Sequence, residues 1–328
     1  MPPPVRRLLP LPLVVLLLAS SCGGGKSAGP TITEFGTHDS PGTPPSALAA
    51  GPDGNVWFTE DQGNTIAKLT PGGDVVRYPA SLAPSGSPYE LVAGPDGNLW
   101  FTVMNGSQVG KITPEGVVTE YREGITIDSG PSGIAAGPDG NVWFTERDDR
   151  VGRITPAGVV TEFSVGISPH SAPHAIVAGP DGNLWFTESD GNRIAKITPA
   201  GVVTEFTQGI TPDSAPSGIA AGPDGNVWFT ELEANRIAKI TPTGDVTEYP
   251  VGLGGSGLLG IAAGPDGNLW FTEYGAARVG RITPAGLVTE FSEGITSDSG
   301  PLAIVAGPDG NVWFAEIYTD RIGRIDLH

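Results

Sequence analysis

Every tryptophan of the chain lies in one short phrase that is repeated seven times. The phrase reads Gly-Pro-Asp-Gly-Asn, then Val or Leu, then Trp-Phe, and consecutive copies are 42 or 43 residues apart. The tryptophans are Trp57, Trp100, Trp143, Trp185, Trp228, Trp270 and Trp313. A fixed period of this length indicates one supersecondary unit copied around an array. Residues present in every copy are therefore expected to build the scaffold, and function is expected where one copy differs.

Each copy reads as four short β-strands joined by turns. In the fourth copy the predicted strands are residues 175–178, 184–188, 193–197 and 202–206. The Asp-Gly pair of the first turn supplies the positive φ that a tight hairpin needs, and the second segment is rich in aromatic and β-favouring residues. No segment shows helical periodicity. Four strands in a copy of about 43 residues predict an all-β, seven-bladed β-propeller with four-stranded antiparallel blades over residues 31–328.

The two ends of the repeated region complete each other. The seventh copy ends at His328 without a fourth strand. The segment Thr-Ile-Thr-Glu-Phe at residues 31–35 matches the fourth strand of the other copies. We therefore expect the N-terminal strand to close the last blade, which removes an open sheet edge.

The first residues are typical of a targeting segment. Arg6 and Arg7 precede an apolar run over residues 8–18 that is too short for a mature membrane span, and Cys22, the single cysteine, follows. This pattern resembles a bacterial lipoprotein signal over residues 1–21, with Cys22 lipidated and residues 22–30 as a flexible tether. The alternative is an ordinary signal peptide with an incidental cysteine. Either interpretation predicts an extracytoplasmic protein, and the first adds a lipid anchor in a bacterial membrane.

The charge distribution argues against a nucleic-acid partner. The formal net charge is −18, and most basic residues fall in two columns of the repeat. One column is Lys68, Lys111, Arg153, Lys196, Lys239, Arg281 and Arg324; the other is Arg150, Arg193, Arg236, Arg278 and Arg321. The repeat spreads these charges around the molecule, whereas phosphate binding needs a concentrated basic surface. We expect a monomer that contacts the membrane only through its lipid.

Three recurring motifs resemble the virginiamycin B lyase, or streptogramin B lyase, family. They are Trp-Phe-Thr-Glu, then Asn-Arg-Ile-(Ala/Gly)-(Lys/Arg)-Ile-Thr, then Gly-Val-Val-Thr-Glu-Phe, and the resemblance covers about residues 31–328. It implies a seven-bladed propeller. It also implies an activity: members of this family open cyclic streptogramin B antibiotics by elimination across an ester bond, with Mg²⁺ as cofactor.

The family's working side chains do not carry over to this sequence. Where the resemblance implies a tyrosine in the first copy and a histidine in the sixth, the chain has Ser46 and Leu259. In the seventh copy Gly300 replaces the metal-binding glutamate and Leu302 replaces the catalytic histidine. Glu316 follows the last Trp-Phe-Ala one residue early, and a one-residue slip in a strand turns a side chain to the other face. We therefore predict no metal site, and Mg²⁺ only if lyase activity survives.

A few polar residues break the repeat at the inner strand. His174 occupies the inner position in the fourth copy, Tyr89 and Glu90 occupy it in the second, and His170 lies in the loop entering the fourth. These residues are expected to face one mouth of the channel, where they would bind a small-molecule or protein ligand. With Glu316, the two histidines are also the candidates for a displaced catalytic site. The alternative is that His174 and Tyr89 are solvated rim residues.

Other polar columns are interpreted as structural because they repeat. A glutamate ends the second strand in six copies, at Glu60, Glu146, Glu188, Glu231, Glu273 and Glu316. These glutamates could ring the mouth, but pairing with the neighbouring basic columns is the favoured interpretation. Asp128, Asp213 and Asp298 in the loops entering the third, fifth and seventh copies either bind a ligand or form ordinary turns.

Two functions of different classes remain at this point. The first is a non-catalytic propeller that binds a small molecule or a protein on its loop face. The second is a Mg²⁺-dependent carbon–oxygen lyase acting on streptogramin B-type cyclic esters through a rearranged site. The fold alone does not decide between them.

Overall fold

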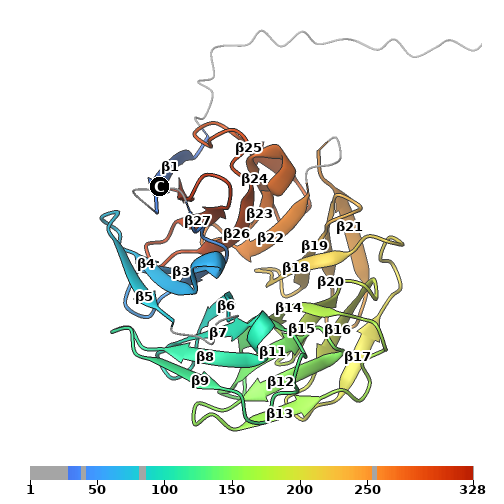
Figure 1. The fold of residues 1–328 in the computed structure, drawn as a ribbon. Helices are drawn as coiled ribbons and strands as arrows, with labels where there is room; N and C mark the ends of the chain where they lie inside the picture. The colour runs from blue at the N-terminus through green and yellow to red at the C-terminus, as the bar shows by residue number, and fades with distance from the viewer. Residues whose placement is uncertain (1–28, 38–41, 81–85, 253–256, 328) are drawn as a thin grey trace, which may run out of the picture.

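The computed structural model describes residues 29–37, 42–80, 86–252 and 257–327. Their strands form seven antiparallel four-stranded sheets. Figure 1 shows these sheets arranged as the blades of a ring around a central channel. The predicted seven-bladed β-propeller is confirmed. Within the described parts of the chain, no helix is long and apolar enough to cross a membrane.

The four strands of a blade follow one another from the channel outward. The innermost strands are β2 (Leu48–Ala50), β6 (Pro88–Ala93), β10 (Pro131–Ala136), β14 (Pro173–Ala178), β18 (Pro216–Ala221), β22 (Leu258–Ala263) and β26 (Pro301–Ala306). The second strands are β3 (Val56–Glu60), β7 (Leu99–Val103), β11 (Val142–Glu146), β15 (Leu184–Glu188), β19 (Val227–Glu231), β23 (Leu269–Glu273) and β27 (Val312–Glu316).

The outer half of each blade repeats in the same way. The third strands are β4 (Thr65–Leu69), β8 (Gln108–Ile112), β12 (Arg150–Ile154), β16 (Arg193–Ile197), β20 (Arg236–Ile240), β24 (Arg278–Ile282) and β28 (Arg321–Asp326). The outermost strands are β1 (Thr31–Gly36), β5 (Val75–Pro79), β9 (Val118–Tyr121), β13 (Val160–Phe163), β17 (Val203–Phe206), β21 (Val246–Pro250) and β25 (Val288–Phe291). Three single 3₁₀ turns, η1 (Asp61–Gly63), η2 (Met104–Gly106) and η3 (Tyr274–Ala276), follow second strands.

The N-terminal strand closes the ring as predicted. β1 pairs with β28 over its whole length, so the last blade has the order β1-β28-β27-β26. Phe35 stacks on Trp313 with ring centroids 5.5 Å apart, and the carboxylate of Glu34 accepts hydrogen bonds from Thr296 and Arg321. The first strand thus acts as the outermost strand of the last blade and gives it both an apolar contact and a charged contact.

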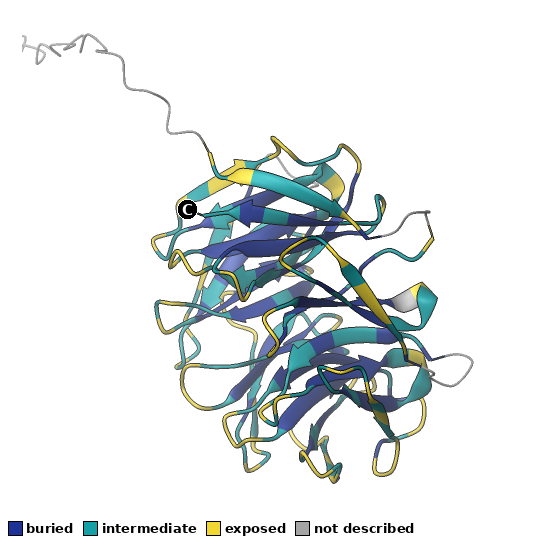
Figure 2. Ribbon diagram, turned by 90° about the vertical axis from the view of Figure 1, so that its left-hand side faces the viewer, coloured by how far each residue is buried: buried dark blue, intermediate teal, exposed yellow. Residues whose placement is uncertain are grey.

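The tryptophans pack between blades and hold the ring together. Trp57, for example, is fully buried and lies in one cluster with Leu99, Phe101 and Ile112 of the next blade. The same arrangement recurs around the ring. Every residue of the second strands is buried, whereas Figure 2 shows exposed residues mainly in the loops and outermost strands. An isolated blade would expose this apolar surface to water. Its burial between blades, which contributes about 25 cal/mol per Å² of apolar surface, is therefore expected to dominate the stability of the ring.

The repeated Asp-Gly-Asn turn is a hydrogen-bonding device for the tryptophan. In the first blade, Asp53 accepts hydrogen bonds from the Trp57 indole at 2.9 Å and from Lys68 at 2.9 Å. Although burial raises the pKa of Asp53, these hydrogen bonds lower it to about 2. Lys68 also lies over the Trp57 and Tyr78 rings. The turns therefore work as hairpins that fix the core, as the sequence predicted, and the first basic column belongs to the scaffold.

Candidate functional site

A β-bulge near the start of the inner strand places two residues of each of six blades at the channel mouth. In six blades the register of the inner strand shifts between its first and fourth residues. In β14 the shift falls between Pro173 and Ile176, so His174 and Ala175 are released from the ladder. Bulges redirect side chains in this way. The bulged pairs include Tyr89, Glu90 and His174, the inner residues that the sequence identified as breaking the repeat.

A ring of buried threonines fixes these bulges. The Thr145 hydroxyl accepts a hydrogen bond from the backbone N–H of Gly133 in its own blade and donates one to the carbonyl oxygen of His174 in the next. The same relay occurs at Thr59, Thr102, Thr187, Thr230 and Thr272. In the seventh blade the corresponding residue is Ala315, which has no hydroxyl. The scaffold thus holds the position of the variable side chains through main-chain contacts alone.

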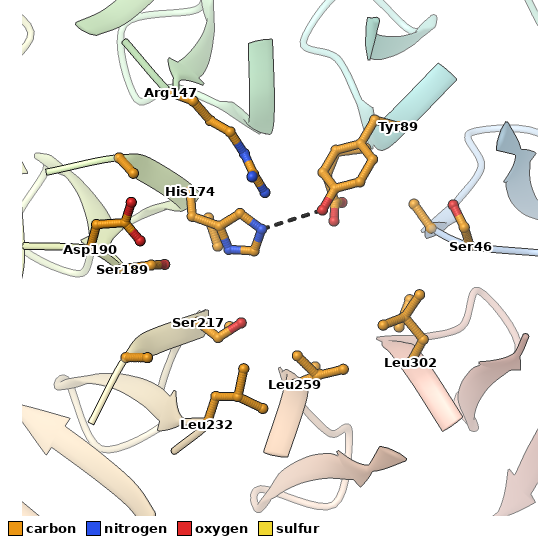
Figure 3. Close-up of a pocket in the computed structure, with 18 residues that line it drawn as sticks. Ser46, Tyr89, Arg147, His174, Ser189, Asp190, Ser217, Leu232, Leu259 and Leu302 are labelled. Atoms are coloured by element: carbon orange, nitrogen blue, oxygen red, sulfur yellow. Dashed lines mark hydrogen bonds between the residues drawn. The ribbon is translucent and has the colours of Figure 1, made fainter. Parts of the chain in front are cut away.

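A cavity of about 370 Å³ lies at this mouth. Its walls differ from one side to the other (Figure 3). Tyr89, Arg147 and His174 lie together on one side, and Leu259 and Leu302 lie on the other. The cavity therefore has a hydrogen-bonding wall and an apolar wall, an arrangement that small-molecule sites commonly have.

Tyr89 of the second blade and His174 of the fourth blade lie close together at the mouth. The Tyr89 hydroxyl is 3.3 Å from Nε2 of His174, within hydrogen-bond distance. Nδ1 of His174 is buried without a hydrogen-bond partner among the described residues. Burial, together with the positive charge of Arg147, lowers the pKa of His174 to about 4. The imidazole is therefore neutral at physiological pH and can both donate and accept a hydrogen bond.

Glu90 faces the same cavity from the other bulged position of β6. Glu90 as a whole is half-buried, since it borders the cavity. Its carboxyl group is nevertheless surrounded by protein, which keeps much of the water away from it. This burial raises the pKa of Glu90 to about 7. Near neutral pH the group therefore exists in both protonation states, a property that suits either proton transfer or a hydrogen bond donated to a ligand.

Two of the predicted site residues lie elsewhere. His170 is exposed in the loop before β14, where it has φ of 59° and its backbone N–H donates to Asp149, and it does not border the cavity. Glu316 is completely buried at the end of β27, where Thr319 donates to it at 3.3 Å. Burial raises the pKa of Glu316 to about 7. The cavity therefore combines Tyr89, Glu90 and His174 but neither of these two residues.

The repeated glutamates at the ends of the second strands are internal and do not ring the mouth. Glu188 is fully buried and pairs with Arg193 at 2.7 Å, and Glu273 pairs with Arg278 at 2.6 Å. Glu146 and Glu231 instead accept hydrogen bonds from serine hydroxyls. The structural interpretation thus agrees with their location, although only some of them pair with arginine.

The aspartates that recur before the inner strands occupy strained turn positions. Asp128, Asp213 and Asp298 have φ values of 61°, 55° and 58°, and His170 shares this conformation. Short polar side chains tolerate the left-handed region better than most others. Their recurrence is explained by the turn, and they do not border the cavity.

The residues present do not fit a Mg²⁺ site of the kind the resemblance implies. The position of the metal-binding glutamate is Gly300, with φ of 65°. Among the described residues, no group of three or more His, Cys, Asp and Glu side chains could hold a metal ion. A hard cation of this size needs oxygen ligands such as carboxylates.

Comparison with known proteins gives the family. The sequence profile of the virginiamycin B lyase family matches residues 30–253 and 210–328. The chain belongs to this family. It is 35% identical to a protein solved as a streptogramin B lyase structure, with a TM-score of 0.85 over 92% of this chain and 98% of that one. No curated protein sequence matches the chain.

Two further structures of the family extend the comparison. Virginiamycin B lyase from Staphylococcus aureus is 35% identical, with a TM-score of 0.84 over 91% of this chain and 99% of that one. A catalytically inactive histidine-to-alanine variant of the S. aureus enzyme, solved with quinupristin, is 34% identical over the same shares, also with a TM-score of 0.84. The family resemblance stated from the repeat motifs is confirmed.

Three further residues at the mouth were not predicted from the sequence. Arg147, Ser189 and Leu232 also border the cavity, and each is the residue that follows the glutamate at the end of a second strand. This column carries a different residue in each of the blades, which is the signal that identifies it. The loops after the second strands reach the same mouth as the inner strands, which the repeat pattern does not indicate.

Proposed function

We propose that the protein is a binding module that holds an amphiphilic small molecule in the cavity at the loop-side mouth of its channel. One observation carries this proposal. The Tyr89–His174 pair and the leucines Leu259 and Leu302 lie on opposite walls of a single cavity of about 370 Å³. Such a site orients a ligand through its polar end and gains affinity by burying its apolar end.

The positions implied by the family resemblance favour binding over elimination. Elimination requires a base near the proton that is lost and a donor or cation near the developing enolate. The corresponding positions, Leu259 and Leu302, carry apolar side chains at the cavity wall. His174, whose pKa is lowered to about 4, is a weak base. We therefore favour ligand binding over elimination as the function of this chain.

One observation favours the alternative, a carbon–oxygen lyase with a rearranged site. Glu90 borders the cavity, and its pKa is raised to about 7. A general base works best when its pKa lies near the operating pH. In this alternative Glu90 would remove the proton and the Tyr89–His174 pair would hold the developing negative charge.

A neutral fluorescent probe tests the binding proposal. N-phenyl-1-naphthylamine, which fluoresces in apolar surroundings, should bind the full chain, and Leu259→Asn should weaken this binding about tenfold because the apolar wall becomes polar. Leu287→Asn is the matched control, since Leu287 is 69% exposed and does not border the cavity. Equal binding by both variants, or no binding by the parent protein, would contradict the proposal.

A turnover assay separates the two functions. The full chain is incubated with quinupristin, with and without Mg²⁺, and the antibiotic is followed by mass spectrometry. The binding proposal expects no linearised product above the protein-free control. Product that forms with the parent chain and is lost with Glu90→Gln or His174→Ala would establish the lyase alternative.

We also propose that the propeller is anchored outside the cytoplasm through a lipid on Cys22 and acts as a monomer. Cys22, the signal over residues 1–21 and most of the tether over 22–30 lie outside the described residues. The support is the sequence pattern alone. Radiolabelled palmitate should be incorporated into the protein expressed in bacteria and should be lost on Cys22→Ala. Unchanged labelling of that variant would refute the anchor.

A further inference from the structure

We infer that the ligand of the cavity carries a carboxylate at its polar end, which Arg147 binds beside the Tyr89–His174 pair. This inference rests on the proposed binding function of the same cavity and names its ligand class: a small amphiphilic monocarboxylate. It depends on Arg147, an arginine that lies outside the two repeated basic columns.

Arg147 is the exception among the basic residues. Every other lysine and arginine in the described segments has a carboxylate within 3.8 Å. Arg147 has no such partner within those segments, and it contacts the rest of the protein through a backbone hydrogen bond from its N–H to Gly130. Because Arg147 is exposed and borders the cavity, its charge is available to a ligand that enters there.

The guanidinium group is directed at the polar wall of the cavity. In Figure 3, the Arg147 side chain extends toward the space between His174 and Tyr89. Its positive charge also contributes to the lowered pKa of His174. The three side chains come from β6, β14 and the loop after β11, so they converge from three blades. A planar guanidinium can donate two hydrogen bonds to a carboxylate, and the neutral Tyr89–His174 pair, which shares one hydrogen bond internally, keeps one further donor for it.

Two acidic groups also border the cavity, and neither removes this preference. Asp190 is exposed and lies on the side of His174 away from Tyr89. Glu90 has a pKa raised to about 7 by burial. A bound carboxylate favours the protonated form of Glu90, which then donates a hydrogen bond instead of repelling the ligand. A cationic ligand would instead meet the charge of Arg147.

The remainder of the ligand is apolar. Leu232, Leu259 and Leu302 form the wall opposite the polar group. No cation other than Arg147 borders the cavity among the described residues. A ligand with a second anionic group would leave that group against leucine, which is unfavourable. The cavity therefore fits one carboxylate attached to a hydrocarbon or aromatic body.

The test uses three probes with one skeleton and different head groups: phenylbutyrate, its primary amide, and phenylbutylamine. Their dissociation constants are measured by displacement of N-phenyl-1-naphthylamine from the full chain. We expect phenylbutyrate to bind about tenfold more tightly than the amide, and the amine to bind most weakly. Arg147→Gln should remove the preference for the acid and leave the affinity of the amide unchanged.

Arg122→Gln is the matched control, because Arg122 is an exposed arginine that pairs with Glu120 away from the cavity. It should keep the preference for the acid. If the amide or the amine binds as well as the acid, or Arg147→Gln keeps the preference, the carboxylate assignment is wrong while the binding function stands. If the dye itself does not bind, the binding function falls, and the assignment falls with it.

Discussion

Replacement of Glu146 by glutamine should stabilise the protein, and the gain should be about 2 kcal/mol larger at pH 8 than at pH 6. Glu146 is completely buried at the end of β11. Ser129 donates a hydrogen bond to Oε1, and Oε2 has no hydrogen-bond partner among the described residues. Burial, together with the negative charges of Glu162 and Asp148, raises the pKa of Glu146 to about 8. The folded protein therefore keeps a proton on this group that an unfolded chain releases.

The sign and size of the effect follow from proton linkage. The ordinary pKa of glutamate is 4.5 and the folded value for Glu146 is about 8. Between these values the folded state binds more protons at this group, so the contribution of Glu146 to stability is greatest below pH 4.5 and is lost as the pH rises toward 8. Each pH unit in this window removes about 1.4 kcal/mol. From pH 6 to pH 8 the loss from Glu146 alone is about 2 kcal/mol, because the slope declines near the folded pKa.

Glutamine has nearly the shape of a protonated glutamic acid and does not ionise. The free energy of unfolding of Glu146→Gln should therefore exceed that of the parent protein by about 2 kcal/mol at pH 6 and by about 4 kcal/mol at pH 8. Urea unfolding at constant ionic strength measures both values. The exposed Glu123→Gln is the control and should show no such pH-dependent gain. A gap between Glu146→Gln and the parent that is the same at both pH values would refute the reasoning.

Three further perturbations test the scaffold. Deletion of residues 30–36 removes β1 from the last blade and should lower the melting temperature of the whole ring; a truncated chain with an unchanged melting temperature would contradict the closure argument. Asp181→Ala removes the acceptor of the Trp185 indole at 2.9 Å and should destabilise the protein by about 1–3 kcal/mol in urea unfolding. Gly218→Ala should lower the melting temperature, because the added carbon would lie 2.2 Å from a carbonyl oxygen of the next blade. Gly36→Ala, with no atom within 4 Å of the new carbon, should not.

The fold was predictable because the repeat states the same information seven times. The Asp-Gly-Asn turn, the Trp-Phe strand and the basic column recur together, and in the structure they form one hydrogen-bonded unit around each tryptophan. The matching ends of the chain predicted the pairing of β1 with β28. In each case a local pattern and the global architecture agree, which is typical of sequences that specify one fold.

The site was predictable only in part. Comparison of the copies found Tyr89, Glu90 and His174, since they interrupt an otherwise small and apolar inner strand. It did not predict that Tyr89 and His174 approach to 3.3 Å, because they are 85 residues apart and belong to blades that are not adjacent. The comparison also did not find Arg147. The position after the second strand carries a different residue in every copy, so there is no consensus residue against which Arg147 would stand out. Such proximity depends on ring geometry and side-chain reach.

The threonine relay explains why these positions can vary at all. Each hydroxyl bonds to a backbone N–H in its own blade and to a backbone carbonyl in the next, so the bulge geometry does not depend on the side chain it presents. His174 and Leu259 occupy equivalent bulges, although one is polar and the other apolar. A propeller built in this way can exchange the groups at its mouth without disturbing the core. Relatives with the same scaffold can therefore differ in what they bind or transform, and the function must be argued from the mouth itself.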